Sequence, residues 1–94
     1  MSEARETVCI TNQRGLHARA SAKFVNAVAK LPEGCSVRVT KDSNEAAGGS
    51  ILGLMMLGAA RGDSIDIIVS GLDGEASAAL GKLVGLVKDG FGED

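Results

Sequence analysis

The sequence predicts an α+β fold in which an antiparallel sheet is covered by helices on a single face. Several short segments alternate apolar and polar residues, so each buries only one side of a strand. Other segments place their apolar residues at helical spacing and form one stripe each. The segments follow one another as β-α-β-β-α-β-α. Together they predict a two-layer sandwich of four strands and three helices.

The first strand and the first helix are expected near the start of the chain. Residues 7–11 alternate, with Val8 and Ile10 on one face, and residues 12–15 form a polar connection. A helix is predicted over residues 18–31, where "LPEG" ends it. The apolar residues at helical spacing are Phe24, Val25, Val28 and Ala29.

Two further strands are expected in the middle of the chain. Residues 35–41 alternate again, and a short strand over 45–47 follows the turn at 42–44. The residues of the longer strand that are expected to face inward are Cys35, Val37 and Val39.

A short apolar run over residues 51–57 follows, with Ser50 as the expected N-cap of a short helix. This seven-residue run has six apolar side chains, more than one helix face buries in so small a domain. Part of the run therefore predicts an exposed patch, and the alternative is that the whole run is core. Expected on the outer side are Ile51, Leu52 and Met55, and expected inside are Leu54 and Leu57.

The last strand and the last helix complete the pattern. Residues 64–70 alternate, and the turn 71–74 supplies Asp73 or a neighbour as a helix cap. The stripe that predicts the final helix consists of Ala76, Ala79, Leu80, Leu83, Val84 and Val87.

Composition indicates one small domain over residues 1–94, with its core over about 7–88. A net charge of −2 and a pI near 5.3 argue against nucleic acid or an anionic membrane surface as the main partner. The charged start leads into no long apolar stretch, so we expect neither a signal peptide nor a membrane helix. We expect a cytoplasmic protein. Cys9 and Cys35 are well separated and the chain has one histidine, so we expect no metal site and no disulfide framework.

The segment "RGLHARAS", residues 14–21, contains that histidine, His17, where the first helix is expected to begin. The first amides of a helix have free N–H groups, and its dipole favours negative charge there. Arg19 adds a fork of donors suited to phosphate, and Gly15 permits a sharp approach to the helix. A helix N-terminus and an arginine both disfavour imidazolium, so we expect a neutral ring with a nucleophilic nitrogen near pH 7. The alternative is that His17 only caps the helix.

Two motifs in this order, "GLHARAS" at 15–21 and "GGSILGLMMLGAARGD" at 48–63, resemble the HPr family. These proteins are the histidine-containing phosphocarriers of the bacterial phosphoenolpyruvate-dependent sugar phosphotransferase system. The resemblance spans roughly Val8 to Lys88. It implies an open-faced β-sandwich. It also implies a stoichiometric phosphoryl carrier that needs no cofactor, and not a turnover enzyme.

By this resemblance, His17 accepts a phosphoryl group on its Nδ1 (pros) nitrogen from phosphorylated enzyme I and passes it to an EIIA protein. Arg19 then supports the phosphohistidine, and Ser50 matches a serine that an HPr kinase/phosphorylase modifies in some bacteria. We expect a monomer, because a carrier needs its docking face free. The residues that match the docking surface for partner proteins are Ile51, Leu52, Met55 and, on the first helix, Lys23.

One residue departs from the family pattern, because Ala20 stands where these proteins usually have proline. Proline would fix φ in the first helical turn without losing a hydrogen bond, so we expect a looser active centre that still accepts phosphate. A nitrogen-branch carrier and a binding module that is never phosphorylated are the alternatives, although Ser50 favours the sugar branch. A small enzyme is disfavoured, because no carboxylate lies near His17 in sequence to orient a base.

Overall fold

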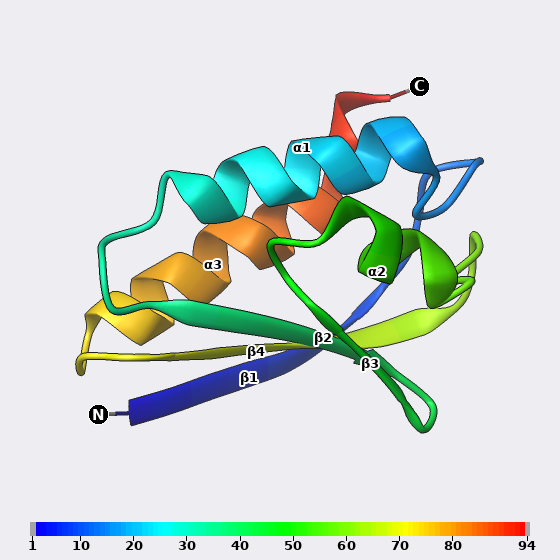
Figure 1. Cartoon of the computed structure of the whole chain (residues 1–94). Coiled ribbons are helices and arrows are strands. Elements are labelled where there is room, and N and C mark those ends of the chain that lie inside the picture. The colour runs from blue at the N-terminus through cyan, green and yellow to red at the C-terminus, as the bar shows by residue number, and fades with distance from the viewer. Residues whose placement is uncertain (1, 94) are drawn as a thin grey trace.

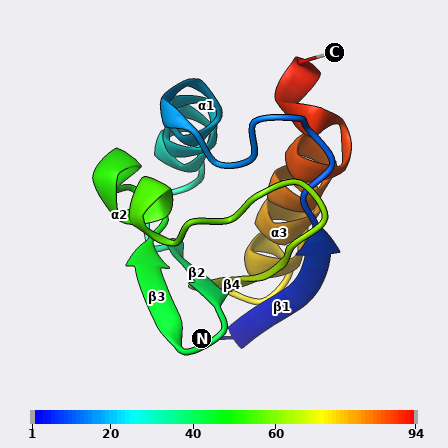
Figure 2. The same cartoon turned by 90° about the vertical axis from the view of Figure 1, so that its right-hand side faces the viewer.

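The computed structural model describes residues 2–93, and its elements have the predicted order (Figure 1). The sheet has the strand order β1-β4-β2-β3, and all neighbouring strands are antiparallel. The three α-helices lie together on one face of this sheet (Figure 2). The predicted open-faced sandwich is therefore confirmed. Its elements are β1 (Ser2–Cys9), α1 (Ala18–Ala29), β2 (Ser36–Lys41), β3 (Asn44–Ala47), α2 (Ile51–Met56), β4 (Ser64–Gly71), α3 (Glu75–Lys88) and a short 3-10 turn, η1 (Gly90–Gly92).

The core lies between the sheet and the helices, where the alternating pattern places it. The stripe predicted for the final helix is buried at all six positions along α3, which packs on β1 and β4. Phe24 of α1 is 1% exposed and belongs to the same buried core. The buried apolar strand residues on this face are Val8, Val37, Val39, Ala46, Ile65, Ile67 and Val69.

The opposite face of the sheet carries no helix, yet Ile68 in the middle of β4 is only 2% exposed there. The alternation of β4 places residue 68 on the face of the sheet that is expected to meet solvent. In register, Ile68 lies between Arg5 of β1 and Arg38 of β2. Long arginine side chains cover apolar surface while their charged ends stay in water. The ends are held by ion pairs of Arg5 with Asp66 and of Arg38 with Glu3 and Glu45.

Several predicted boundaries differ from the structure. β1 runs from Ser2 to Cys9, where residues 7–11 were predicted, because its first half pairs with β4 in a main-chain ladder although it has no alternating apolar pattern. Ile10 is buried but lies beyond the strand, where its N–H donates to Asp63 O. α1 ends at Ala29, which is exposed, so the predicted end at residue 31 and the inward position of Ala29 are wrong.

Two further differences concern a strand start and a helix cap. Cys35 is half-buried and precedes β2, so its predicted place inside the strand is wrong. The N-cap of α3 is Gly74, the neighbour of Asp73, and it makes no side-chain cap hydrogen bond. Gly74 has φ +83, a conformation that suits glycine at a sharp turn into a helix.

The core also extends beyond its expected end at residue 88. Phe91, in η1, is 1% exposed and belongs to the same cluster of buried apolar residues. Its burial fixes the last residues of the described chain against the body of the domain. Within residues 2–93, no helix has the length and apolar character needed to cross a membrane.

Candidate functional site

His17 is the N-cap of α1, as predicted for the start of this helix. Its backbone is extended, with φ −75 and ψ −178, and the first intrahelical bond runs from Ser21 N–H to His17 O over 2.9 Å. The N–H of Arg19 donates to Nδ1 of the ring over 3.4 Å. One amide of the first turn thus points at Nδ1 of the ring, and the helix dipole favours negative charge at this end of α1.

Ala20, which replaces the proline usual in the resembling family, is the third residue of α1 and is fully buried. It precedes Ser21, the first residue whose N–H bonds back into the helix. A proline at this position would lose no intrahelical hydrogen bond. The hydrogen bonds of the first turn are therefore compatible with either residue.

The loop before the helix is held close to a second segment of the chain. Gly15 has φ +63, and the next residue, Leu16, is buried and donates its N–H to Ala59 O over 3.0 Å. A Cβ on Gly15 would overlap that carbonyl oxygen and lie 2.9 Å from Ala60 Cα. The predicted role of Gly15 in a sharp approach to the helix is confirmed, since both φ and space exclude a side chain.

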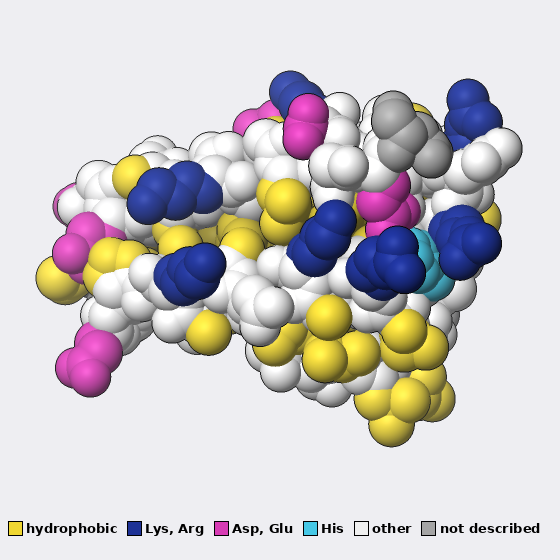
Figure 3. All heavy atoms as spheres, turned by 90° about the horizontal axis from the view of Figure 1, so that it is seen from above, with side chains coloured by type: hydrophobic (Ala, Val, Ile, Leu, Met, Phe, Trp, Pro, Cys, Tyr) yellow, Lys and Arg dark blue, Asp and Glu magenta, His cyan; other side chains and the backbone are white. Residues whose placement is uncertain are grey.

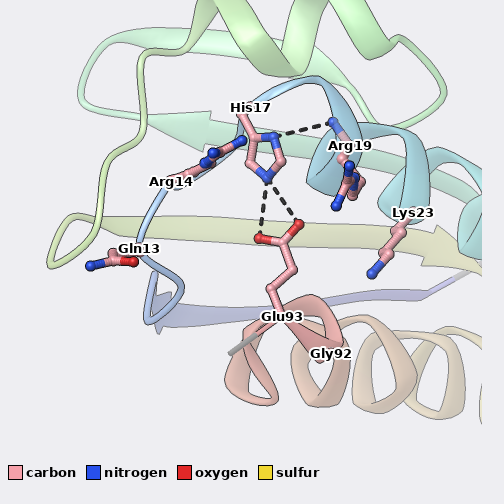
Figure 4. Close-up of a pocket in the computed structure, with 7 residues that line it drawn as sticks. All are labelled: Gln13, Arg14, His17, Arg19, Lys23, Gly92 and Glu93. Carbon is pink, nitrogen blue, oxygen red and sulfur yellow. Dashed lines mark hydrogen bonds and ion pairs between the residues drawn. The ribbon is translucent and has the colours of Figure 1, made fainter.

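A carboxylate from the far end of the chain reaches the other ring nitrogen. Oε2 and Oε1 of Glu93 lie 2.9 Å and 3.1 Å from Nε2 of His17 (Figure 4). The side chains are 22% exposed for His17 and 15% for Glu93. Oε1 also accepts a hydrogen bond from Nδ2 of Asn12 over 3.1 Å. Sequence reasoning found no carboxylate near His17, because Glu93 follows it by 76 residues.

These contacts define the protonation of the ring. A nitrogen that accepts the Arg19 N–H must have a lone pair, so Nδ1 is the unprotonated nitrogen. Nε2 faces two carboxylate oxygens and is therefore the N–H donor. The hydrogen bonds thus assign the proton to Nε2 and a lone pair to Nδ1.

Glu93 is ionised in this arrangement. Burial acts to raise its pKa, but hydrogen bonds from Asn12 and His17, together with the nearby positive charge of Lys23, hold the pKa below the ordinary value of 4.5. A carboxyl group whose pKa is lower in the folded than in the unfolded protein stabilises the fold at pH values above the pKa of the unfolded state. This contribution is complete above pH 4.5 and is lost as the pH falls through the lowered pKa.

Basic side chains surround the histidine. An open depression of about 460 Å³ is lined by Gln13, Arg14, His17, Arg19, Lys23, Gly92 and Glu93 (Figure 4). Arg14 and Arg19 are exposed, whereas Nζ of Lys23 donates to Phe91 O over 2.7 Å. Lys23, expected beside the docking surface, thus lies at the histidine site and anchors the C-terminal segment. The depression suits a small anion with several oxygens.

An apolar surface lies next to these basic groups. Figure 3 shows hydrophobic side chains gathered beside the histidine and the Lys and Arg side chains around it. We name the exposed side chains of α2 the α2 patch: Ile51 (40% exposed), Leu52 (67%), Met55 (40%) and Met56 (75%). Leu54 and Leu57 are buried, as predicted. The run was therefore divided correctly between surface and core, although Met56 was not foreseen.

Ser50 is the N-cap of α2, as predicted. Its Oγ accepts a hydrogen bond from Gly53 N–H over 2.9 Å, and the side chain is half-buried beside Ile51. Within residues 2–93, no three side chains of His, Cys, Asp or Glu gather closely enough to hold a metal ion.

Most of the chain is similar to known phosphocarrier proteins. Residues 4–89 match the family described as the PTS HPr component phosphorylation site. The chain is 39% identical over 89 residues to phosphocarrier protein HPr of Neisseria meningitidis serogroup A, which covers 95% of this chain and 96% of that protein. It is 33% identical over 93 residues to phosphocarrier protein NPr of Escherichia coli K12, with 96% and 97% covered. The crystal structure of HPr from Bacillus anthracis superposes with a TM-score of 0.82 at 29% identity, over 93% of this chain and 99% of that one.

Proposed function

The chain belongs to the HPr family of phosphocarrier proteins of the phosphotransferase system, and from this membership we propose that it carries a phosphoryl group on His17. It takes the group from phosphorylated enzyme I and hands it to an EIIA protein. It acts as a monomeric, cytoplasmic intermediate that is consumed and regenerated in each transfer. The observation that carries the proposal is Nδ1 of His17, which has a lone pair at the N-terminus of α1 among basic side chains.

The transfer step follows from the chemistry of that nitrogen. The Nδ1 lone pair attacks phosphorus, a P–N bond forms, and the donor keeps the electron pair of the bond that breaks. The phosphoryl oxygens would meet the first-turn amides of α1 and the guanidinium of Arg19. Phosphoryl transfer depends chiefly on positioning and on charge stabilisation, and both are built into this turn.

Incubation with phosphoenolpyruvate and enzyme I tests the proposal. We expect acid-labile phosphate on His17, at one group per chain, and loss of that label when an EIIA protein is added. A chain that stays unlabelled under conditions that label an established HPr would contradict the proposal. A binding module that works through the α2 patch alone gives that negative result.

The branch of the system is a separate part of the proposal. Ser50, in the position of a regulatory serine, supports a carrier of the sugar branch. The 33% identity with an NPr protein supports the nitrogen branch as the alternative. Phosphorylated protein mixed with EIIA proteins of both branches distinguishes them, since the cognate acceptor receives the group faster.

We further propose that the α2 patch docks both partners in turn. Leu52 is 67% exposed on α2, whereas Leu72, at 59%, lies in the turn between β4 and α3, away from α2 (Figure 1). Buried apolar side chains contribute about 1.5–3 kcal/mol each, less the costs of association. This suits a partner that must leave quickly.

The Leu52→Ala variant is expected to bind enzyme I about tenfold more weakly, because roughly 1.4 kcal/mol of buried contact is removed. Leu72→Ala makes the same chemical change at a similar exposure and is expected to bind as the wild type does. Isothermal titration of both variants makes the comparison. Equal losses in the two variants, or none in Leu52→Ala, would rule out docking through the patch.

Phosphorylation of Ser50 by an HPr kinase/phosphorylase is proposed as a switch on docking. A phosphate adds about −1.5 to −2 charge and would stand at the edge of the α2 patch. The phosphate oxygens can accept the hydrogen bond that Gly53 N–H donates to Ser50 Oγ, so the fold should change little.

The Ser50→Asp variant is therefore expected to lose about tenfold in affinity for enzyme I, with a melting temperature within roughly 3 °C of the wild type. Ser77→Asp is the matched control, because Ser77 is exposed in the first turn of α3 and far from the patch. If both variants lose affinity to the same extent, net charge is responsible and the proposed switch is wrong.

A further inference from the structure

The end of the described chain folds back over the N-terminus of α1. Gly90, Phe91 and Gly92 all have positive φ, at 64, 59 and 70. Phe91 is the costly member, since a left-handed backbone is unfavourable for a residue with a side chain. Its ring is 1% exposed, and its carbonyl accepts the 2.7 Å bond from Lys23. Burial and this bond maintain a turn that places Glu93 against His17.

Asn12 holds the other side of the Glu93 carboxylate. The Asn12 side chain is 98% buried, since only 2% of the residue is exposed. Its Nδ2 donates to Glu93 Oε1 over 3.1 Å and to Gly15 O over 2.9 Å. Because both bonds run to acceptors, they fix the amide with its nitrogen toward Glu93. In this orientation, Oδ1 is a buried acceptor with no hydrogen-bond partner within residues 2–93, which is energetically unfavourable.

We propose that Asn12 and Glu93 form a positioning pair that keeps the proton of His17 on Nε2 and balances the ring's charge when Nδ1 carries phosphate. This inference rests on the proposed function of His17. Asn12 orients the carboxylate, and the carboxylate orients the ring, as an acidic residue orients a histidine base in hydrolases. Neither residue touches the phosphoryl group, so both act through His17.

The charge balance of the step gives the pair its role. When the Nδ1 lone pair bonds to phosphorus, the proton on Nε2 stays and the ring becomes a cation. The charged groups that face the ring are Arg14 from the loop, Arg19 and Lys23 from α1, and Glu93 from the C-terminal segment. Among residues 2–93, Glu93 is the only acidic residue that lines this depression. The carboxylate therefore stabilises the phosphorylated ring against three neighbouring cations.

The Glu93→Gln variant tests the charge. It keeps a hydrogen-bond acceptor for Nε2 and removes the negative charge. We expect the ratio of phosphorylated to free protein, at equilibrium with phosphorylated enzyme I, to fall about tenfold, and transfer to an EIIA protein to become faster. Asp89→Asn is the matched control, because Asp89 is an exposed acid in the same segment and outside the depression.

The Asn12→Asp variant tests the link to Asn12. Aspartate has the shape of asparagine but repels the Glu93 carboxylate, so we expect a fall in the same direction although Asn12 does not touch the ring. In the double variant with Glu93→Gln, the ratio should fall no further than in Glu93→Gln alone, because the two residues act in series. Additive effects would show that Asn12 acts independently of Glu93.

Nitrogen NMR of the His17 ring gives a readout that does not depend on phosphorylation. We expect the Nε2–H tautomer in the wild type and in Asp89→Asn, and a mixture with the Nδ1–H tautomer in Glu93→Ala. An unchanged tautomer in Glu93→Ala, or equal phosphorylation ratios in Glu93→Gln and Asp89→Asn, would overturn the inference. A wild type that shows the Nε2–H tautomer but takes no phosphate would instead contradict the proposed function.

Discussion

Replacing His17 with asparagine is expected to abolish phosphoryl acceptance and to leave the fold intact. The side chain has two roles, since Nδ1 is the proposed nucleophile and also accepts the Arg19 N–H as the cap of α1. Asparagine is among the best N-cap residues, but its amide nitrogen has no free lone pair to attack phosphorus. The rate of labelling should fall by at least about a thousandfold, as when an enzyme loses its nucleophile.

His17→Ala separates the cap from the chemistry. It removes both roles, so it should be equally inactive and, in addition, less stable by about 0.5–2 kcal/mol. Urea unfolding of the two variants, alongside labelling from phosphoenolpyruvate through enzyme I, measures each effect. If His17→Asn is labelled at the wild-type rate, the acceptor is another residue and the proposed function fails.

The sequence predicts the helical layer well because the buried residues of a helix recur at a regular spacing along the chain. All six predicted residues of α3 are buried, since that helix lies along β1 and β4 and meets apolar surface at every turn. The same reasoning fails for β1 and for Ile68. The first half of β1 pairs with β4 in a main-chain ladder, which leaves no apolar pattern in the sequence. Ile68 lies in register between two arginines, whose long side chains can cover apolar surface although a hydropathy pattern counts them as exposed.

The site is predictable where it is local and not where it is assembled by the fold. His17, Arg19 and Gly15 are close in sequence, so a helix start with a histidine at its cap could be foreseen. Glu93 meets His17 only because three successive residues adopt positive φ and Phe91 is buried. The glycines on both sides of Phe91 were the one signal in the sequence, and glycine pairs alone do not specify where a chain end will pack.

The Gly15→Ala variant is expected to lose both stability and activity, and Gly34→Ala only part of the stability. Both glycines have positive φ, at +63 and +92, so an alanine costs about 1–2 kcal/mol at either position. At Gly34 nothing lies within 4 Å of the added carbon, whereas at Gly15 the carbon overlaps Ala59 O. Backbone must move to relieve that overlap, which adds about 1–3 kcal/mol.

The movement at Gly15 is also what links this substitution to the chemistry. The carbonyl of Gly15 accepts the bond that orients Asn12, and His17 follows two residues later as the cap of α1. A displacement of about 1 Å in a reacting group costs on the order of a hundredfold in rate. We therefore expect labelling of Gly15→Ala to slow by about that factor even where urea curves show it fully folded, while Gly34→Ala labels normally. Equal stability losses in the two variants, with normal labelling in both, would mean that contact with Ala59 does not set the position of the histidine.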